Sequence, residues 1–204
     1  MNSTIDLLLR RRSVSPRLLG EPAPSLRQVS TILTAASRVP DHGRAVPWRF
    51  IVIRKDGAAR LGEVIVATYF ADHPDAPEGV LETESRRLLR APLVIAVVSS
   101  PHEHSKAPEW EQQLSAGAAA MNLVIAVNAL GFASNWHTEW YAYDRRVTSE
   151  LGLKGDERIA GFVHIGTAIE QPKERPRPEL SDVVVTYGGT GIKSYNPELG
   201  DGNI

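Results

Sequence analysis

The sequence predicts one α+β domain in which helices cover both faces of a sheet, a three-layer α/β/α arrangement. Helical and strand-like segments follow one another without the strict alternation of a doubly wound sheet. The run "LVIAVVSS" at 93–100 is apolar throughout, as in a strand buried on both faces. The segment 108–130 predicts a long helix that is apolar almost all round, so it needs cover on every side.

The first two helices are predicted from their starts. Ser3-x-x-Asp6 and Ser25-x-x-Gln28 have the spacing of capping boxes, in which two side chains satisfy free backbone donors of the first turn. Pro40 stops the second helix because it cannot donate a backbone hydrogen bond.

The remaining elements follow from apolar periodicity and from turn residues. We expect a loop at 16–24, a strand at 48–54 with a turn at 55–57, a helix at 58–70, a mobile connection at 72–79, a helix at 79–92, the strand at 93–100, the long helix at 108–130, an extended piece at 132–137, a small helix from Asp144 to Gly152, a strand at 158–168, a proline-rich connection at 171–182 and a last strand at 183–187. The domain is predicted to span 1–188, with a glycine-rich tail at 189–204.

Composition excludes several classes of protein. The 23 Lys and Arg residues are balanced by 24 Asp and Glu, so an anion site must be local and the protein is not a general polyanion binder. The absence of cysteine excludes disulfides, thiolate metal sites and a cysteine nucleophile. The N-terminus does not have the pattern of a signal peptide and no stretch is long enough to span a membrane, so we expect a cytoplasmic location.

The segment "RRRS" at 10–13 allows two interpretations. Arginines at the end of a helix commonly complement its dipole and stay solvated, which is the more frequent case. Alternatively, Arg11, Arg12 and Ser13 form a phosphate clamp, because guanidinium groups present paired donors to phosphate oxygens and serine adds a hydroxyl.

The segment "RVPDHG" at 38–43 lies in a loop stiffened by prolines. Asp41 and His42 could simply form a turn and satisfy each other. A loop of fixed shape could instead present Arg38 and His42 as donors to a planar heterocycle.

The segment "NWHTEW" at 135–140 places Trp136, His137 and Thr138 just after the long helix. Aromatic residues in such a position more often pack in a core or an interface than contact a ligand. Alternatively, these residues form a surface that contacts a ligand, with Thr138 and backbone groups as hydrogen-bond donors.

Other motifs exclude alternative sites. His102-x-His104 lacks a further ligand at helical spacing, so no metal site is predicted. Neither GxGxxG, GxxxxGK[ST] nor GxSxG occurs, which excludes a Rossmann fingerprint, a P-loop and a nucleophile elbow. Five charged residues are predicted to form a solvated face: Glu82, Glu84, Arg86, Arg87 and Arg90.

Three ordered stretches carry a resemblance. They are "LLLRRRS", "RVPDHGRAVPWRFIVI" and "WEQQLSAGAAAMNLVIAVNALGFASNWHT", continued by "GFVHIGTA" and "RPRPELSDVVVTY". Together they resemble the nitroreductase family, in particular its short subgroup of FMN-dependent NAD(P)H oxidoreductases. The resemblance implies a three-layer sandwich with a mixed, mainly antiparallel sheet, and a homodimer with FMN sites at the subunit interface.

The resemblance also implies the cofactor-binding residues, with Arg38 and His42 reaching the flavin from the other subunit. They are Arg11, Arg12, Ser13, Arg38, His42, Trp136, His137 and Thr138. The long helix would pack at the subunit interface. No catalytic side chain is implied, because the flavin carries the chemistry.

The implied activity is transfer of a hydride from NAD(P)H, through FMN, to a small organic acceptor such as a nitroaromatic, a quinone or an enone. The alternatives are an FMN-binding module or sensor without turnover, a flavin enzyme of different chemistry, or an α+β domain without flavin. Two positions depart from the family pattern. Ser15 stands where a basic residue is usual, and His137, whose charge depends on pH near neutrality, stands where arginine is frequent.

Overall fold

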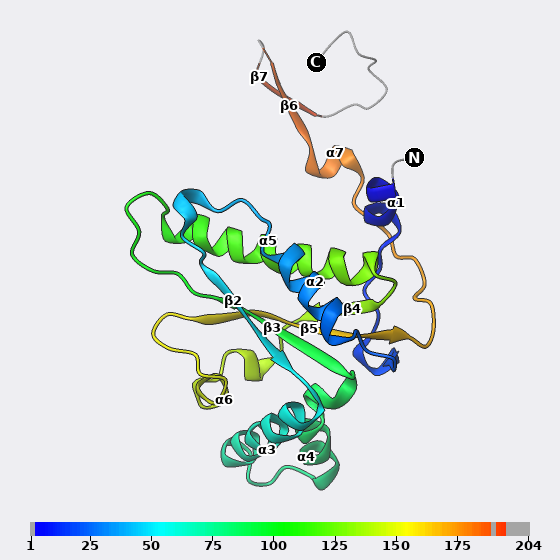
Figure 1. The fold of residues 1–204 in the computed structure, drawn as a ribbon, viewed down its shortest axis with the longest axis vertical. Coiled ribbons are helices and arrows are strands. Elements are labelled where there is room, and N and C mark those ends of the chain that lie inside the picture. Colours follow the sequence, from blue (N-terminus) through cyan, green and yellow to red (C-terminus); the bar gives the residue numbers. More distant parts are fainter. Residues whose placement is uncertain (1–2, 189–190, 195–204) are drawn as a thin grey trace. The chain divides into compact units, whose positions relative to one another are not determined.

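The computed structural model describes residues 3–188 and 191–194. The chain forms two compact units, Met1–Pro172 and Lys173–Ile204. The first unit holds a five-stranded sheet with helices on both of its faces (Figure 1). Its helices are α1 (Ser3–Arg10), α2 (Leu26–Ala36), α3 (Lys55–Asp72), α4 (Glu78–Ser85), α5 (Glu109–Ala129) and α6 (Arg145–Glu150). Four 3₁₀ turns join them: η1 (Pro16–Leu18), η2 (His42–Arg44), η3 (Arg87–Arg90) and η4 (Trp140–Ala142).

The sheet is built around one long central strand, β5 (Arg158–Ala168). On one side β5 pairs with β3 (Leu93–Ser99), which pairs with β2 (Trp48–Ile53), and the end of β5 also pairs with β1 (Leu19–Gly20). On its other side β5 pairs with β4 (Ala133–His137). Every described pairing is antiparallel, so the parallel component of the expected mixed sheet is not among the described strands.

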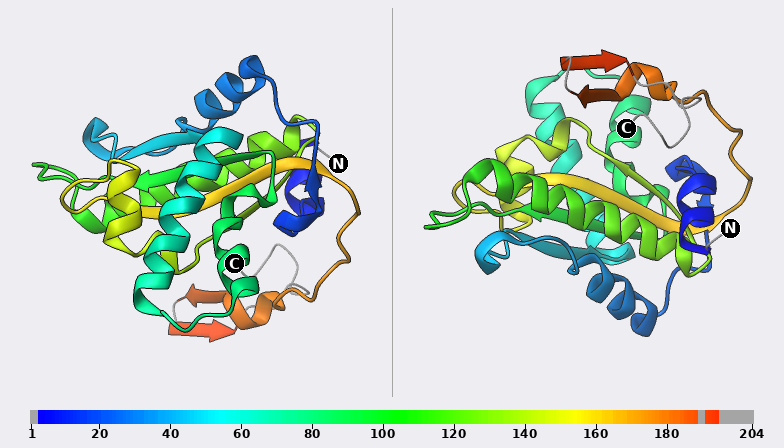
Figure 2. Two further views of the ribbon diagram at one scale, coloured as in Figure 1. Left: turned by 90° about the horizontal axis from the view of Figure 1, so that it is seen from below. Right: turned by 90° about the horizontal axis from the view of Figure 1, so that it is seen from above.

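Helices lie on both faces of the sheet (Figure 2), and a separate hydrophobic cluster fills the space on each face, which makes this a three-layer structure. Strand β3 contributes to both: Val94 faces the cluster under α3, and Ile95 faces the cluster under α2 and α5. Since side chains alternate along a strand, the continuous apolar run at 93–100 reflects burial on both faces, as predicted.

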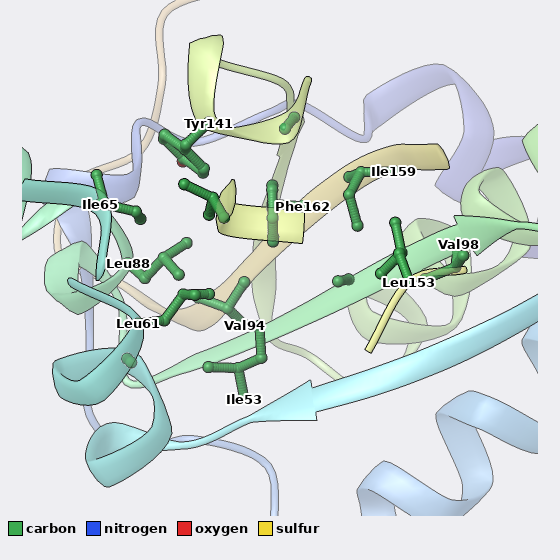
Figure 3. Close-up of a cluster of buried hydrophobic side chains, with 14 residues drawn as sticks. Ile53, Leu61, Ile65, Leu88, Val94, Val98, Tyr141, Leu153, Ile159 and Phe162 are labelled. Atoms are coloured by element: carbon green, nitrogen blue, oxygen red, sulfur yellow. The ribbon is translucent and has the colours of Figure 1, made fainter. Parts of the chain in front are cut away.

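The cluster under α3 and α6 is drawn in Figure 3. Leu61 and Ile65 of α3 point toward Val94 of the sheet, and Tyr141 packs beside Phe162 (Figure 3). The rings of Tyr141 and Phe162 lie 5.2 Å apart at a tilt of 48°. Each such side chain contributes about 1.5–3 kcal/mol when fully buried, so the two clusters supply most of the driving force for the fold.

Most predicted elements are present, and the boundaries that differ have physical reasons. The expected turn at 55–57 is the first turn of α3, because a glycine at a helix start costs little. The expected helix at 79–92 is interrupted at Arg86, which separates α4 from η3. The short strand β1, in the expected loop at 16–24, was not predicted because two residues carry no periodic pattern.

The second unit contains α7 (Leu180–Val183), β6 (Val185–Gly188) and β7 (Gly191–Ser194), with β6 and β7 paired as an antiparallel hairpin. The last predicted strand, at 183–187, therefore begins two residues later than expected. Most of the predicted glycine-rich tail at 189–204 lies outside the described residues. In the part of the chain that the structure describes, none of the helices combines the length and apolarity required to cross a bilayer.

Candidate functional site

Two of the predicted groups of residues are brought together by hydrogen bonds to Val14. Its backbone N–H donates to the carbonyl of Ser134 at 3.1 Å. Its carbonyl accepts from Nδ2 of Asn135 at 3.1 Å. The Val14 side chain is buried with Ala133 in a small apolar cluster. The segment that carries Arg11–Ser13 is thereby held against β4, the strand that carries Trp136 and His137.

The two interpretations of the "RRRS" segment apply to different residues: Arg10 behaves as a solvated helix end, whereas Arg11, Arg12 and Ser13 lie beyond the helix. Arg10 is the last residue of α1, and its Nη2 pairs with Asp6 at 2.7 Å on an exposed surface, as expected of a helix end. Arg11 and Arg12 follow the helix and are only half-buried, while Ser13 is exposed. The donors suited to an anion therefore stand beyond the helix, next to β4.

The Trp136 side chain lies against the backbone of β5 at Ala160 and Gly161. Its Nε1 donates to the carbonyl of Ala160 at 3.1 Å, and the side chain keeps 37% of its surface exposed. A Cβ atom at Gly161 would lie only 1.9 Å from that nitrogen. Gly161 is therefore required for the position of the indole. Sequence reasoning missed this residue, since a glycine within a strand pattern only indicates that something approaches closely.

His137 is surrounded by polar groups on the same strand and by a second histidine. Its Nδ1 lies 2.8 Å from Oδ1 of Asn135, and its buried Nε2 lies 3.7 Å from Oε2 of Glu139, beyond hydrogen-bond distance. Its ring stacks on His164 at 4.6 Å and 14°. Burial and the neighbouring charge of His137 lower the pKa of His164 to about 4, although the backbone of Arg87 opposes the shift. His164 is therefore neutral near neutral pH.

Thr138 follows β4 and is half-buried. Its Oγ1 accepts a hydrogen bond from the Tyr143 hydroxyl at 2.8 Å. Because Tyr143 is 70% exposed, this contact lies at the protein surface. Trp136, His137 and Thr138 are thus consecutive at the end of β4, and because side chains alternate along a strand, Trp136 lies on the face of Val163 and His137 on the face of Phe162.

The predicted solvated face at 82–90 is wrong for three of its five residues. Glu84 is 2% exposed and accepts from Arg87 and from Nε1 of Trp140, the latter at 2.8 Å. Arg87 and Arg90 both reach Glu139, at 2.6 and 3.2 Å. Only Glu82 and Arg86 form an exposed pair, at 3.2 Å.

This buried network sets the ionisation of the residues that follow Thr138. Burial alone would raise the pKa of Glu139, but the neighbouring His137, the hydrogen bond from Tyr141 and the charges of Arg90 and Arg87 lower it to about 2. Burial and the charge of Glu139 raise the pKa of Tyr141, whose hydroxyl donates to Glu139 at 2.9 Å. Glu139 thus anchors the end of β4 as a carboxylate.

The loop that carries Arg38 and His42 is held by polar residues of α5. Nδ2 of Asn122 donates to the Arg38 carbonyl at 2.9 Å, and Nδ1 of His42 lies 2.6 Å from Oε2 of Glu111. Oγ of Ser115 donates to the carbonyl before Asp41 at 2.5 Å. The few polar residues of this apolar helix therefore position the loop.

The loop also contains strained backbone. Arg44 and Val46 have φ of 58° and 49°, which is unusual for any residue with a Cβ and more so for a β-branched one. Both carboxylate oxygens of Asp41 accept from the Val46 N–H, each at 3.1 Å. Asp41 and His42 do not satisfy each other; Asp41 holds the strained turn and His42 binds α5. Strain maintained in this way is typical of functional loops.

The structure does not bring Arg38 and His42 to the other predicted residues within one chain. Among the described residues, none of their hydrogen bonds or ion pairs reaches Arg11–Ser13 or Trp136–Thr138. Asn128, which holds β4 through a bond to Ser134 Oγ at 3.1 Å, stands 17 residues after Glu111. That spacing corresponds to about 26 Å along the helix axis.

His102 and His104, the two histidines considered above as metal ligands, make local contacts in their loop. Nδ1 of His104 accepts from the backbone N–H groups of Lys106 and Ala107, at 3.2 and 3.1 Å. His102 lies edge-on to His104, with ring centroids 6.1 Å apart. Within residues 3–188 and 191–194, no group of three or more His, Cys, Asp or Glu residues could hold a metal ion.

Comparison with known proteins gives the same assignment at the levels of sequence and fold. The nitroreductase family model matches residues 8–167. YdjA of Escherichia coli (strain K12), which bears the provisional name NAD(P)H nitroreductase, is 36% identical over 163 residues, covering 80% of this chain and 87% of YdjA.

Two solved structures share the fold. A nitroreductase-like family protein from Bacillus cereus aligns with a TM-score of 0.74 and 20% identity, over 89% of this chain and 94% of its own. A variant of NfnB, described as an FMN- and NADPH-dependent nitroreductase from Sphigopyxis sp. strain HMH, aligns with a TM-score of 0.72 and 21% identity, over 91% and 99%. With a family match over most of its length and a relative above 30% identity, this chain belongs to the nitroreductase family.

Proposed function

We propose that this protein is an FMN-dependent oxidoreductase that uses NAD(P)H to reduce a small organic acceptor of the nitroaromatic, quinone or enone type. The observation that carries the proposal is the pair of hydrogen bonds through Val14, which joins the segment after α1 to β4 at Ser134 and Asn135. Membership of the family supports the reaction class. The description of NfnB as dependent on FMN and NADPH supports the cofactor and the electron donor.

The residues beside Val14 have the chemistry that FMN requires. The guanidinium groups of Arg11 and Arg12 suit a phosphate, because each can donate two parallel hydrogen bonds to phosphate oxygens. Ser13 and Thr138 add hydroxyl groups. This donor set fits the phosphate and ribityl parts of the cofactor.

The ring side of the proposed site also fits. The Trp136 N–H is already bonded to Ala160, so the exposed part of the indole can offer only its face or edge to a planar ring. On the opposite face of β4, the buried Nε2 of His137 makes no hydrogen bond of normal length within the described chain, so this nitrogen lacks a polar partner. A flavin has carbonyl and ring nitrogen groups that can bond to an imidazole nitrogen.

Bound FMN would supply the hydride chemistry, and the chain would supply binding and electrostatics. The half-buried cations Arg11 and Arg12 would favour negative charge on whatever is held against them. Glu139, with a pKa of about 2, remains ionised near neutral pH, and Tyr141, with a raised pKa, keeps its proton. Neither can exchange a proton under these conditions, so we assign no acid or base role to them.

The proposed site is completed by a second copy of the chain. The loop that carries Arg38 and His42 is held to α5 through Asn122 and Glu111, and the two side chains would serve the partner's cofactor. Helix α5 exposes Trp110 and Leu114 by 67% and 55%, which is unusual for large apolar residues unless a partner covers them. Ile5, Leu8 and Leu9 of α1 add further exposed apolar surface. We therefore expect a homodimer with α5 in its interface.

The purified protein tests the proposal through its visible absorbance. We expect a yellow protein that loses its colour when NADPH or NADH is added without oxygen and regains it with a nitroaromatic or quinone. A yellow protein that is not reduced by either nucleotide would favour an FMN-binding module without turnover. A protein that stays colourless after FMN is added would contradict the proposed cofactor.

A matched pair of variants tests where FMN binds on the chain. Arg11→Ala should weaken FMN binding, by about 1.5–3 kcal/mol for a lost charge-assisted hydrogen bond. Arg27→Ala removes the same side chain from the exposed start of α2 and should leave binding unchanged. Equal affinity in both variants would contradict the placement of the cofactor.

A further inference from the structure

A cavity of about 690 Å³ lies at the end of the sheet where β1 and the start of β3 meet the helices α3 and α4. None of the eight proposed cofactor-binding residues lines it. Its size falls within the range of about 300–1,000 Å³ that small-molecule sites occupy. The cavity is therefore a second candidate site, separate from the one at Val14.

The walls of this cavity carry an excess of positive charge. Arg17, Lys55, Arg86 and Arg90 line it, against a single carboxylate, Glu21. One oxygen of that carboxylate is already engaged, because Oε2 of Glu21 accepts from the backbone N–H of a residue two positions later at 2.7 Å. The protein as a whole has a formal net charge of −1, so the excess is local.

Two of the four cations have no partner of their own. In the part of the chain that the structure describes, the side chains of Arg17 and Lys55 make neither an ion pair nor a hydrogen bond. Arg86 forms only an exposed pair with Glu82 at 3.2 Å. The free and weakly paired cations are thus available to an anion that enters the cavity.

The fourth cation is fixed in place. The Arg90 side chain is 14% exposed, and its Nη1 donates to both carboxylate oxygens of Glu139 at 3.2 Å. Because Arg loses less entropy on binding when its side chain is already ordered, it is a suitable anchor. Arg90 also connects the cavity to the end of β4.

The floor of the cavity is apolar. Leu19 and Ala91 line it and are 4% and 7% exposed, and Leu89 and Pro92 extend the same surface. Apolar surface beneath a cationic rim favours a ligand that has both an apolar body and an anionic group. The excess of cations on the rim disfavours a metal cation, because like charges repel.

We propose that this cavity binds a small organic anion, a phosphate or carboxylate carried on an apolar body. Arg17 and Lys55 would pair with the anionic group, Arg90 would add a fixed donor, and Leu19 and Ala91 would contact the body. The proposal does not depend on the proposed reductase activity, because it concerns different residues.

Calorimetric titration of the protein tests this, with one equivalent of FMN per chain present so that the first site is filled without excess FMN, which is itself a phosphate on an aromatic body. The probes are phenyl phosphate, benzoate and benzyl alcohol, which share an aromatic body and differ in the polar group. We expect phenyl phosphate or benzoate to bind, and benzyl alcohol to bind at least about tenfold more weakly, because it cannot form the charged hydrogen bonds. The stronger of the two anions identifies the class of ligand.

Matched double variants locate the binding. Arg17→Ser with Lys55→Ser should weaken binding of the anion by at least about tenfold. Arg27→Ser with Lys106→Ser removes the same charge from exposed positions outside the cavity and should have no effect. All four side chains are exposed, so these changes should leave the fold intact.

Three results would overturn the proposal. The first is failure of both anions to bind the wild-type protein. The second is equal binding of benzyl alcohol and the anions. The third is binding that survives in the Arg17 and Lys55 variant but is lost in Arg11→Ala, which would place the probe in the proposed cofactor site instead.

Discussion

The side chain of Asn135 holds the carbonyl of Val14 at 3.1 Å, while its own Oδ1 lies 2.8 Å from Nδ1 of His137. One amide therefore positions both the segment after α1 and a ring on β4. Asn135→Leu keeps the approximate size of the side chain and removes both contacts. We expect FMN affinity to fall by roughly tenfold, equivalent to about 1.4 kcal/mol, and unfolding to require about 1–3 kcal/mol less.

Fluorescence titration with FMN and urea denaturation measure the two effects of Asn135→Leu. Thr31→Leu is the control, because Thr31 is exposed on α2 and its Oγ1 donates to the Arg27 carbonyl of the same helix. If Asn135→Leu lost stability but bound FMN as well as the wild type, the link between Val14 and the cofactor would be wrong.

Gly161 provides a second prediction, because a Cβ there would overlap Trp136 at 1.9 Å. Gly161→Ala should displace the indole and reduce the free energy of unfolding by about 1–3 kcal/mol, the usual cost of overpacking. In a Trp136→Ala background the same change should cost much less, because the clash has been removed. Urea denaturation of the wild type, the two single variants and the double variant gives the coupling energy between Gly161 and Trp136. A coupling energy near zero would mean that a Cβ at position 161 does not clash with the indole.

Mixed dimers test whether the cofactor site is shared between subunits. Arg11→Ala and Arg38→Ala homodimers should each bind FMN weakly. A dimer with one chain of each kind has one site with both changes and one site with neither. We expect it to bind one FMN per two chains with wild-type affinity. Doubly tagged dimers can be purified and titrated, and absence of a restored site would show that both arginines serve the site of their own chain.

His164 should make stability depend on pH in a mildly acidic range. Its pKa in the folded protein is about 4, below the ordinary value of 6.5, because of burial and the charge of His137. The unfolded chain therefore binds a proton at higher pH than the folded one. As pH falls from 6.5 to 4 the free energy of unfolding should decrease by at most about 3 kcal/mol. His164→Leu should flatten this slope, whereas the exposed His73→Gln should not; equal slopes in urea denaturation would contradict the assignment.

Below pH 4.5, Glu139 should be the main cause of the pH dependence of the free energy of unfolding. Its pKa is lowered from 4.5 to about 2, so the stabilisation it provides is complete above pH 4.5 and is lost as pH falls toward 2. Glu139→Gln should be less stable than the wild type at neutral pH, since Arg87 and Arg90 lose their carboxylate, and should show a shallower loss between pH 4.5 and 2. Glu63→Gln, on the exposed face of α3, is the control. A wild-type slope in Glu139→Gln would contradict the prediction.

Local patterns were sufficient to predict much of the fold. The capping box at Ser25 and the cap at Asp144 are both present, because such contacts involve residues two or three positions apart. The apolar run of β3 and the long helix α5 were predicted from composition and period alone. These features depend on neighbours in sequence, which a single chain reveals.

The features that were missed depend on residues far apart in sequence. The charges of α4 and η3 have the spacing of a solvated face, but Glu139, some 50 residues later, draws Arg87 and Arg90 inward. The contact between Val14 and Asn135 spans 121 positions. The predicted residues after α1 and on β4 could be named from resemblance, but only the hydrogen bonds of Val14 to Ser134 and Asn135 place the two segments next to each other.

The polar residues of α5 limit how the length of this helix can change during evolution. Ser115 and Asn122 hold the loop at 38–42, and Asn128 holds the start of β4. Deleting one residue between them would turn the later part of the helix by about 100°. Either the loop or β4 would then lose its partner. We therefore expect insertions and deletions among relatives to accumulate in the surface connections and to be rare between Ser115 and Asn128.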